Sequence, residues 1–196
     1  MRAKYGFVAL FLAIGVSMAG CGSAPQAAID AAKASLDQAV TAGAGEYAGT
    51  ALKAAQDAQA ALEAELKVQE GKWFKSYTKA TELAATAKTA ADQAVTDAAA
   101  GKEKAKAEAT ALVAEVKTAL AEAQALLEKA PKGKGTAADL EVLKTDLANA
   151  ATSIADSEAA LGTERFLDAK AKAEAAKATA AAVKTAVETA IAAKKR

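Results

Sequence analysis

The sequence contains no histidine, and cysteine occurs once in its 196 residues. The missing histidine excludes imidazole-based general catalysis and the common metal sites that use histidine. A single cysteine excludes a disulfide framework. Most acidic side chains lie three or four residues from a lysine on the expected solvent faces of helices, so no isolated carboxylate pair is left for acid–base chemistry. We therefore predict no catalytic residue, no metal and no cofactor, and a protein that is not an enzyme.

The chain also lacks an excess of either charge, with 25 basic and 24 acidic residues and a formal net charge of +1. Opposite charges are interleaved along the sequence. A balanced chain creates no field that attracts nucleic acid or anionic lipid. We therefore expect no nucleic-acid partner, and the composition leaves the oligomeric state open.

The N-terminus has the three parts of an export signal. Arg2 and Lys4 form a short basic start, an apolar run occupies residues 5–16, and a cleavage site of mostly small residues follows in 17–21. The apolar run is too short to span a bilayer, which takes about 20 residues. The segment is therefore expected to direct export and then to be removed.

The only cysteine follows directly after Ala19-Gly20. This arrangement resembles a bacterial lipoprotein signal, which implies cleavage before Cys21 and acylation of Cys21. Gly22 in the next position implies transfer to the outer membrane, with the protein facing the periplasm. Several acyl chains on one residue give durable anchoring. The alternative is ordinary secretion, with cleavage after Ala19.

About a third of the chain is alanine, the strongest helix former. Apolar residues recur at alternating spacings of three and four, which is typical of helices that pack like coiled coils. These stripes run through residues 29–39, 52–66, 73–126, 140–161 and 166–190, with Gln59 interrupting the second. Alanine buries only one methyl group, so we expect a thin core between closely spaced helices.

Glycine-rich segments separate the stripes at residues 43–45, 70–72, 131–135 and 162–163. Ser23 with Gln26, and Thr136 with Asp139, have the spacing of capping boxes at helix starts.

Gly101 is the only weak point within the long stripe of residues 73–126. One glycine costs about 1 kcal/mol in a helix and need not end it. We therefore predict one continuous helix through Gly101, and a gain of up to about 1 kcal/mol in the free energy of unfolding for Gly101→Ala. The alternative is a single bundle in which the chain folds back at Gly101.

Each half of the chain has the order helix, glycine-rich turn, helix, short turn with an aromatic, helix. Phe74 and Phe166 are expected to open the third helix of each half. Short turns make neighbouring helices antiparallel. The predicted fold is an all-α antiparallel helical bundle of two tandem three-helix units joined by a long shared helix. The predicted parts are a signal peptide in 1–20 and units in 21–100 and 101–196.

The first half also carries a distinctive set of small and aromatic residues. They are Ala42-Gly43-Ala44, Glu46-Tyr47-Ala48, Leu52, Ala55, Gly71 through Tyr77, Ala80, Ala84, Ala87 and Ala91. Through these residues, the stretch from Ile29 to Ala94 is similar to an uncharacterised alanine-rich domain family of Gram-negative envelope lipoproteins. The resemblance implies a helical envelope protein and assigns no functional residue.

After Cys21, aromatic residues occur at only five positions, all near expected helix ends: Tyr47, Trp73, Phe74, Tyr77 and Phe166. One interpretation is that they fill the ends of the alanine core. The other is a docking patch for a partner, formed by Trp73, Phe74 and Tyr77. Adjacent residues of a helix cannot both face one seam, so either Trp73 or Phe74 is expected to be partly exposed.

The basic segment 131–136 is superficially similar to a phosphate-binding loop, but it lacks the glycine spacing and the preceding strand of one. We interpret it as a basic flexible loop. The leading functional hypothesis is a non-enzymatic, lipid-anchored spacer or interaction module of the cell envelope, with an envelope protein or peptidoglycan as a candidate partner. The alternative is a periplasmic holdase or carrier that binds apolar clients between loosely packed helices.

Overall fold

The computed structural model describes residues 23–130 and 137–194. This part of the chain forms six α-helices and no strand: α1 (Gln26–Thr41), α2 (Ala44–Tyr47), α3 (Gly49–Glu70), α4 (Thr78–Glu128), α5 (Ala137–Gly162) and α6 (Phe166–Lys194). The all-α helical bundle expected from the alanine content and the apolar spacing is confirmed.

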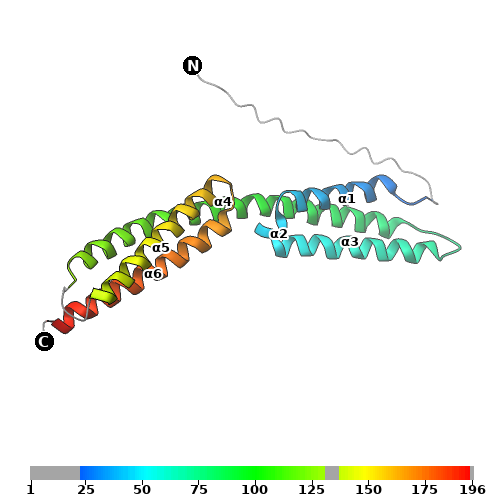
Figure 1. Ribbon diagram of the computed structural model, residues 1–196. Coiled ribbons are helices and arrows are strands. Elements are labelled where there is room, and N and C mark those ends of the chain that lie inside the picture. The colour runs from blue at the N-terminus through cyan, green and yellow to red at the C-terminus, as the bar shows by residue number, and fades with distance from the viewer. Residues whose placement is uncertain (1–22, 131–136, 195–196) are drawn as a thin grey trace, which may run out of the picture.

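Helix α4 is the long central helix on which the other helices pack. It has 51 residues and continues through Gly101 without a break. At 1.5 Å per residue it is about 77 Å long. The other helices lie along its two halves, α1 to α3 along one and α5 and α6 along the other (Figure 1). The predicted continuous helix is confirmed, and the alternative in which the chain folds back at Gly101 is wrong.

Helices α1 and α3 pack on the first half of α4. Two successive clusters of apolar side chains show their directions; the first includes Ile29, Leu62 and Ala84, and the second includes Ala39, Leu52 and Ala98. Helix α1 therefore runs parallel to α4, and α3 runs antiparallel to both. The start of α1 and the loop between α3 and α4 consequently lie at the same end of the molecule (Figure 1).

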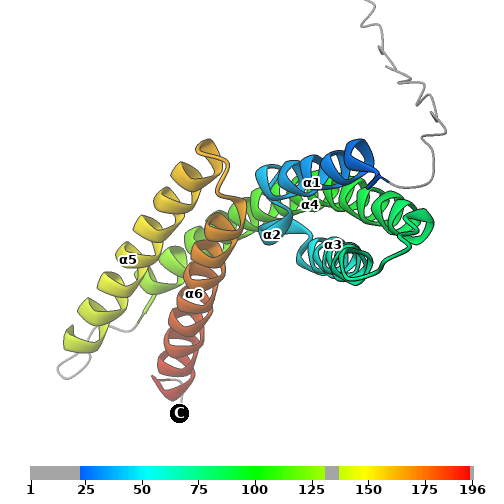
Figure 2. The same cartoon turned by 90° about the vertical axis from the view of Figure 1, so that its right-hand side faces the viewer.

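Helices α5 and α6 pack on the second half of α4, and a view turned by 90° separates them clearly (Figure 2). The core between them contains larger side chains, including Val116, Leu120, Leu147, Ile154 and Val183. Helix α6 runs parallel to α4, towards the end of the molecule that lies opposite the start of α1; this end is called the far end below. The C-terminal end of α6 and the N-terminal end of α1 are therefore at opposite ends (Figure 1).

A series of ion pairs, called here the α4–α6 ladder, joins these two helices. Three lysines of α6 each pair with the glutamate that lies 62 positions earlier in α4: Lys170–Glu108 (2.7 Å), Lys177–Glu115 (2.6 Å) and Lys184–Glu122 (3.5 Å). The pairs recur every seven residues, as expected for charges flanking a coiled-coil seam. Glu108 also lies 3.9 Å from Lys104 of its own helix, so this glutamate of the ladder has a partner within α4 as well.

The start of α1 differs from its prediction. Pro25 is the N-cap residue, and no side chain caps the helix. A capping box needs Ser23 as the N-cap residue, but Gln26 is already the first helical residue. Its Nε2 donates instead to Oδ1 of Asp30 at 2.8 Å. The other predicted box depends on Thr136, which lies outside the described residues.

The turn after α1 contains a short helix that the sequence did not predict. Gly43 has a left-handed φ of 82°, which ends α1 as expected from the glycine-rich segment. The amides of Glu46 and Tyr47 then both donate to the carbonyl oxygen of Gly43, at 3.0 Å each. These bonds form α2, which places Tyr47 against α4.

Candidate functional site

The loop between α3 and α4, residues 71–77, contains the predicted docking residues. Trp73 and Phe74 are 94% and 87% exposed, and both lie outside any helix. The prediction that Phe74 opens a helix is wrong, because α4 begins only at Thr78. The expectation that either Trp73 or Phe74 is partly exposed is confirmed, and both of them are exposed. Tyr77 is partly buried against the core of the first half. The structure therefore separates Tyr77 from the exposed pair.

A buried polar network fixes the stem of this loop. Nε2 of Gln69 donates to Oε1 of Glu65 at 2.6 Å, and the backbone amide of Ser76 donates to Oε1 of Gln69 at 3.0 Å. Lys79 of α4 pairs with Oε2 of Glu65 at 2.9 Å. The bond to Ser76 holds the backbone in a loop where the sequence pattern predicted helix. The exposed aromatic pair is thus carried by a defined loop.

The carboxylate of Glu65 and the ammonium group of Lys79 neutralise each other within this network. Hydrogen bonds from Gln69 and then Lys79 lower the pKa of Glu65 from its ordinary value of 4.5. Glu65 is therefore ionised at neutral pH. The network keeps α3, the loop and α4 together.

Lys72 and Lys75 flank the aromatic pair, and both are exposed. Among the described residues, the ion pair of this region is Lys79 with Glu65, and neither Lys72 nor Lys75 takes part in one. Residues 71–77 contain these two lysines and no acidic residue. The two lysines are functional candidates that the apolar spacing does not reveal, although their positions on either side of Trp73-Phe74 are visible in the sequence.

The interpretation that aromatic residues fill the ends of the core holds for other positions. Phe166 is 3% exposed and opens α6, as predicted. Lys102 of α4 lies with its Nζ 6.0 Å from the centre of the Phe166 ring and 2.7 Å from Oε2 of Glu164. Phe166 is therefore a buried anchor at the middle of the molecule.

Gly101 lies next to this anchor, in contact with the first half of the chain. A Cβ atom on residue 101 would overlap the backbone carbonyl oxygen of Tyr47 and lie 3.1 Å from the Cβ of Tyr47. Burial, followed by the neighbouring charge of Glu46, raises the pKa of Tyr47 above its ordinary value of 10.0. The predicted stabilisation by Gly101→Ala is therefore wrong, because the glycine allows α2 to approach α4.

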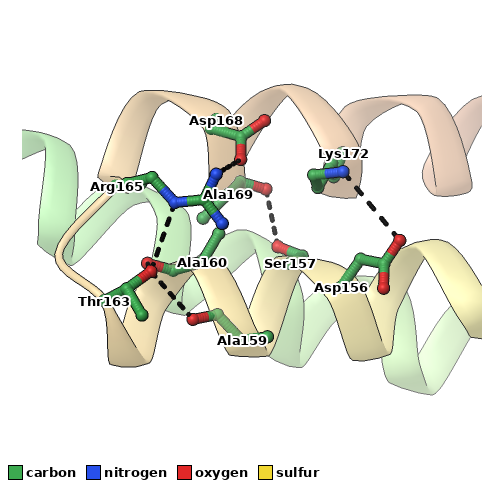
Figure 3. Close-up of polar contacts among 9 residues, drawn as sticks. All are labelled: Asp156, Ser157, Ala159, Ala160, Thr163, Arg165, Asp168, Ala169 and Lys172. Carbon is green, nitrogen blue, oxygen red and sulfur yellow. Dashed lines mark hydrogen bonds and ion pairs between the residues drawn. The ribbon is translucent and has the colours of Figure 1, made fainter.

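The turn between α5 and α6 is held by polar contacts (Figure 3). Oγ of the buried Ser157 donates to the carbonyl oxygen of Ala169 at 2.6 Å. Arg165 donates from Nε to Oγ1 of Thr163 at 3.2 Å and pairs with Asp168 at 3.2 Å. These contacts join the two helices and the turn to each other. Their role is structural.

The far end of the molecule contains a groove between α4 and α5, with a volume of about 390 Å³. Three leucines, Leu127, Leu140 and Leu147, line it together with the polar residues Gln124, Glu128 and Lys144. The volume is at the low end of the range for small-molecule sites. This groove corresponds to the predicted alternative of an apolar-client carrier.

Two predicted features lie outside the described residues: the lipidation site at Cys21 and the basic loop at 131–136. Within the part of the chain that the structure describes, no three cysteine or acidic side chains come together as a metal-binding group. None of the helices described combines the length and the apolar character needed to cross a bilayer. No protein-family model, curated protein or solved structure matches the chain. The resemblance to the alanine-rich envelope family stays a prediction.

Proposed function

We propose that this protein is a non-enzymatic, lipid-anchored component of the bacterial cell envelope that acts as a helical spacer. In this proposal Cys21 is acylated, the anchor lies in the outer membrane, and the helices extend into the periplasm. The observation that carries the proposal is the elongated shape of the molecule. Helix α4 is about 77 Å long, and the N-terminal and C-terminal ends of the described chain lie at opposite ends of the molecule (Figure 1).

The anchor is tested by metabolic labelling with a fatty-acid analogue. The wild-type chain is expected to take up the label, and Cys21→Ala is expected to take up none, because its only cysteine is lost. Equal labelling of both chains, or of neither, would contradict the anchor.

The spacer role is tested by energy transfer from a dye on the protein to acceptor dyes in the membrane. A donor is attached either at Asp30→Cys, in the first turns of α1, or at Ala193→Cys, near the end of α6; both positions are exposed. We expect strong transfer from position 30 and little from position 193, since the length of α4 separates them. Similar transfer from both positions would show a molecule lying along the membrane and would reject the spacer.

The groove between α4 and α5 favours the second candidate function, a carrier of apolar clients. The test is binding of an apolar fluorescent dye, and suppression of client aggregation, by the wild type and by Leu140→Glu. A carrier that uses this groove would lose both activities in the variant. The spacer proposal expects no difference between the two chains.

A further inference from the structure

We propose that the loop formed by residues 71–77 docks into the interface of the lipid bilayer that holds the anchor, and so sets the spacer upright. The inference rests on the proposed anchor at Cys21, which supplies the membrane. The lipid surface is recognised by an exposed Trp73-Phe74 pair between Lys72 and Lys75.

The first argument is the exposure of the aromatic pair. Trp73 and Phe74 are 94% and 87% exposed, whereas the other large apolar side chains that are exposed, such as Val40 at 55%, keep much more of their surface covered. Aromatics make up only 4% of the sequence. A chain this poor in large side chains leaves two of them in water, at adjacent positions of one loop. Such an apolar patch indicates a binding surface.

The second argument is the preorganisation of the loop. Glu65 and Gln69 are 8% and 3% exposed. The Oε1 of Gln69 accepts from the amide of Ser76 at one end of the loop, and the carbonyl oxygen of Gln69 accepts from the amide of Lys72 at the other, at 3.1 Å. The pair of Lys79 with Glu65 joins α3 to α4 beside the loop. Trp73 and Phe74 therefore project from a stem that is already ordered. Little conformational entropy is lost when the pair meets a surface.

The third argument is the position of the loop relative to the anchor. Ala24 and Tyr77 pack on the same apolar cluster, so the start of the described chain and the end of the loop are neighbours. Cys21 is two residues before Ser23, and an extended chain spans at most about 7 Å over that distance. An acyl chain on Cys21 thus brings this end of the molecule, and the loop with it, to the membrane.

The fourth argument is the chemistry of the loop. Tryptophan prefers the headgroup region of bilayers, because its apolar ring and its N–H group meet different surroundings there. Lysines beside it can place their stems on apolar surface and their charges near phosphates. A protein partner fits less well, because lysine is depleted at protein interfaces and the exposed neighbours Glu70, Lys72 and Lys75 form no apolar surround.

Trp73 is the only tryptophan in the chain, so its fluorescence reports on the loop alone. The full-length protein, purified from envelopes, is reconstituted in vesicles of phosphatidylethanolamine and phosphatidylglycerol, part of which carries bromine on the acyl chains. We expect the emission of Trp73 to shift to shorter wavelength on reconstitution and to be quenched by the brominated lipid.

The matched control moves the tryptophan to the other end of α1. Trp73→Phe combined with Val40→Trp places the indole at an exposed position 14 residues from the start of α1, about 21 Å along the helix. This tryptophan is expected to keep the emission of a water-exposed indole and to escape quenching. Equal quenching at both positions would overturn the proposal, because it would show the molecule lying along the membrane.

Lys72→Gln with Lys75→Gln tests the charges while leaving the aromatic pair in place. On vesicles that contain phosphatidylglycerol, the equilibrium constant for docking is expected to fall about fivefold for each lysine replaced. No change is expected on vesicles of phosphatidylcholine alone. A variant indistinguishable from the wild type on both vesicles would remove the lysines from the proposed site.

The failures of anchor and loop can be told apart. A chain without acyl label that washes off the vesicles contradicts the proposed anchor and removes the basis for the orientation. A chain that stays on the vesicles while Trp73 remains water-exposed and unquenched overturns the docking loop alone. Crosslinks from a photoreactive group at position 73 to an envelope protein, and none to lipid, would assign the loop to a protein partner instead.

Discussion

The two halves of α4 are covered in different ways. In the first half, every buried apolar position of α4 from Ala80 to Ala98 is alanine. In the second half, the buried positions include Val113, Val116 and Leu120. The first half also buries polar side chains in α1 and α3, including Ser35 and Gln59, while the corresponding buried polar residue described in the second half is Ser157.

This contrast has an energetic consequence. Alanine allows helices to approach closely, but each methyl group removes little apolar surface from water. Burial of one such group stabilises the fold by about 0.8 kcal/mol. Within the described chain no donor reaches the buried Oε1 of Gln59, which lowers the stability of the first half further. The second half has the larger core and the α4–α6 ladder. We therefore expect the first half to open more readily than the second.

The largest expected effect is the loss of a large side chain from the second half. Leu120→Ala should lower the free energy of unfolding by about 2–5 kcal/mol, because it leaves a cavity where Leu120 is 6% exposed. Urea denaturation followed by circular dichroism measures the loss, and hydrogen exchange locates it in α5 and α6. Val142→Ala, at an exposed position of α5, should change stability by less than about 0.5 kcal/mol. Equal loss of protection in α1 and α3 would contradict a cavity whose effect is confined to the second half.

The reverse substitution tests the alanine stripe. Ala94→Leu should cost about 1–3 kcal/mol, because Ala94 is fully buried and the added atoms force α1 and α3 away from α4. Faster hydrogen exchange in α1 and α3 is the expected readout. Ala99→Leu places the same side chain on an exposed position of the same helix and should have almost no effect. A stable Ala94 variant would mean that the first half has room for larger residues.

The junction between the halves should show a smaller effect. Gly101→Ala is expected to lower the free energy of unfolding by up to about 2 kcal/mol, since overpacking against Tyr47 costs about 1–3 kcal/mol and better helix propensity returns about 1. Gly49→Ala is the matched control, because a Cβ there meets nothing within 4 Å. It should raise stability by about 0.4–1 kcal/mol. A melting temperature raised by both substitutions would contradict the close contact at Gly101.

The smallest effect concerns pH and the ion pairs of the second half. Hydrogen bonds from Lys170 and Lys102 lower the pKa values of Glu108 and Glu164 from 4.5. Because these pKa values are lower in the folded state, the stabilisation is present above pH 4.5 and is lost as the pH falls through the folded values. Thermal unfolding at a series of acidic pH values should show this loss. Glu108→Gln should reduce the acid sensitivity, and an unchanged pH profile would contradict the role of the ladder.

Much of the fold could be predicted because its causes are local. Alanine content, the three–four spacing and the glycine-rich breaks predict the long helices, and the continuity of α4 follows from the low cost of one glycine. The candidate site was only partly predictable. The pattern indicated Trp73 and Phe74, but it placed them on a helix, because the bond from Ser76 to Gln69 cannot be inferred from spacing.

The sequence by itself determined the class of structure: all-α, rich in alanine and built on one long helix. Tertiary contacts decided what individual residues do. They made Gly101 the contact point for Tyr47, aligned Lys177 with Glu115 across two helices, and left Trp73 in water while Phe166 became buried. The physical reason is the sequence separation over which each interaction acts. Helix formation depends on residues within one or two turns, whereas burial, close approach and ion pairing depend on segments that are distant in the chain and meet only in the folded protein.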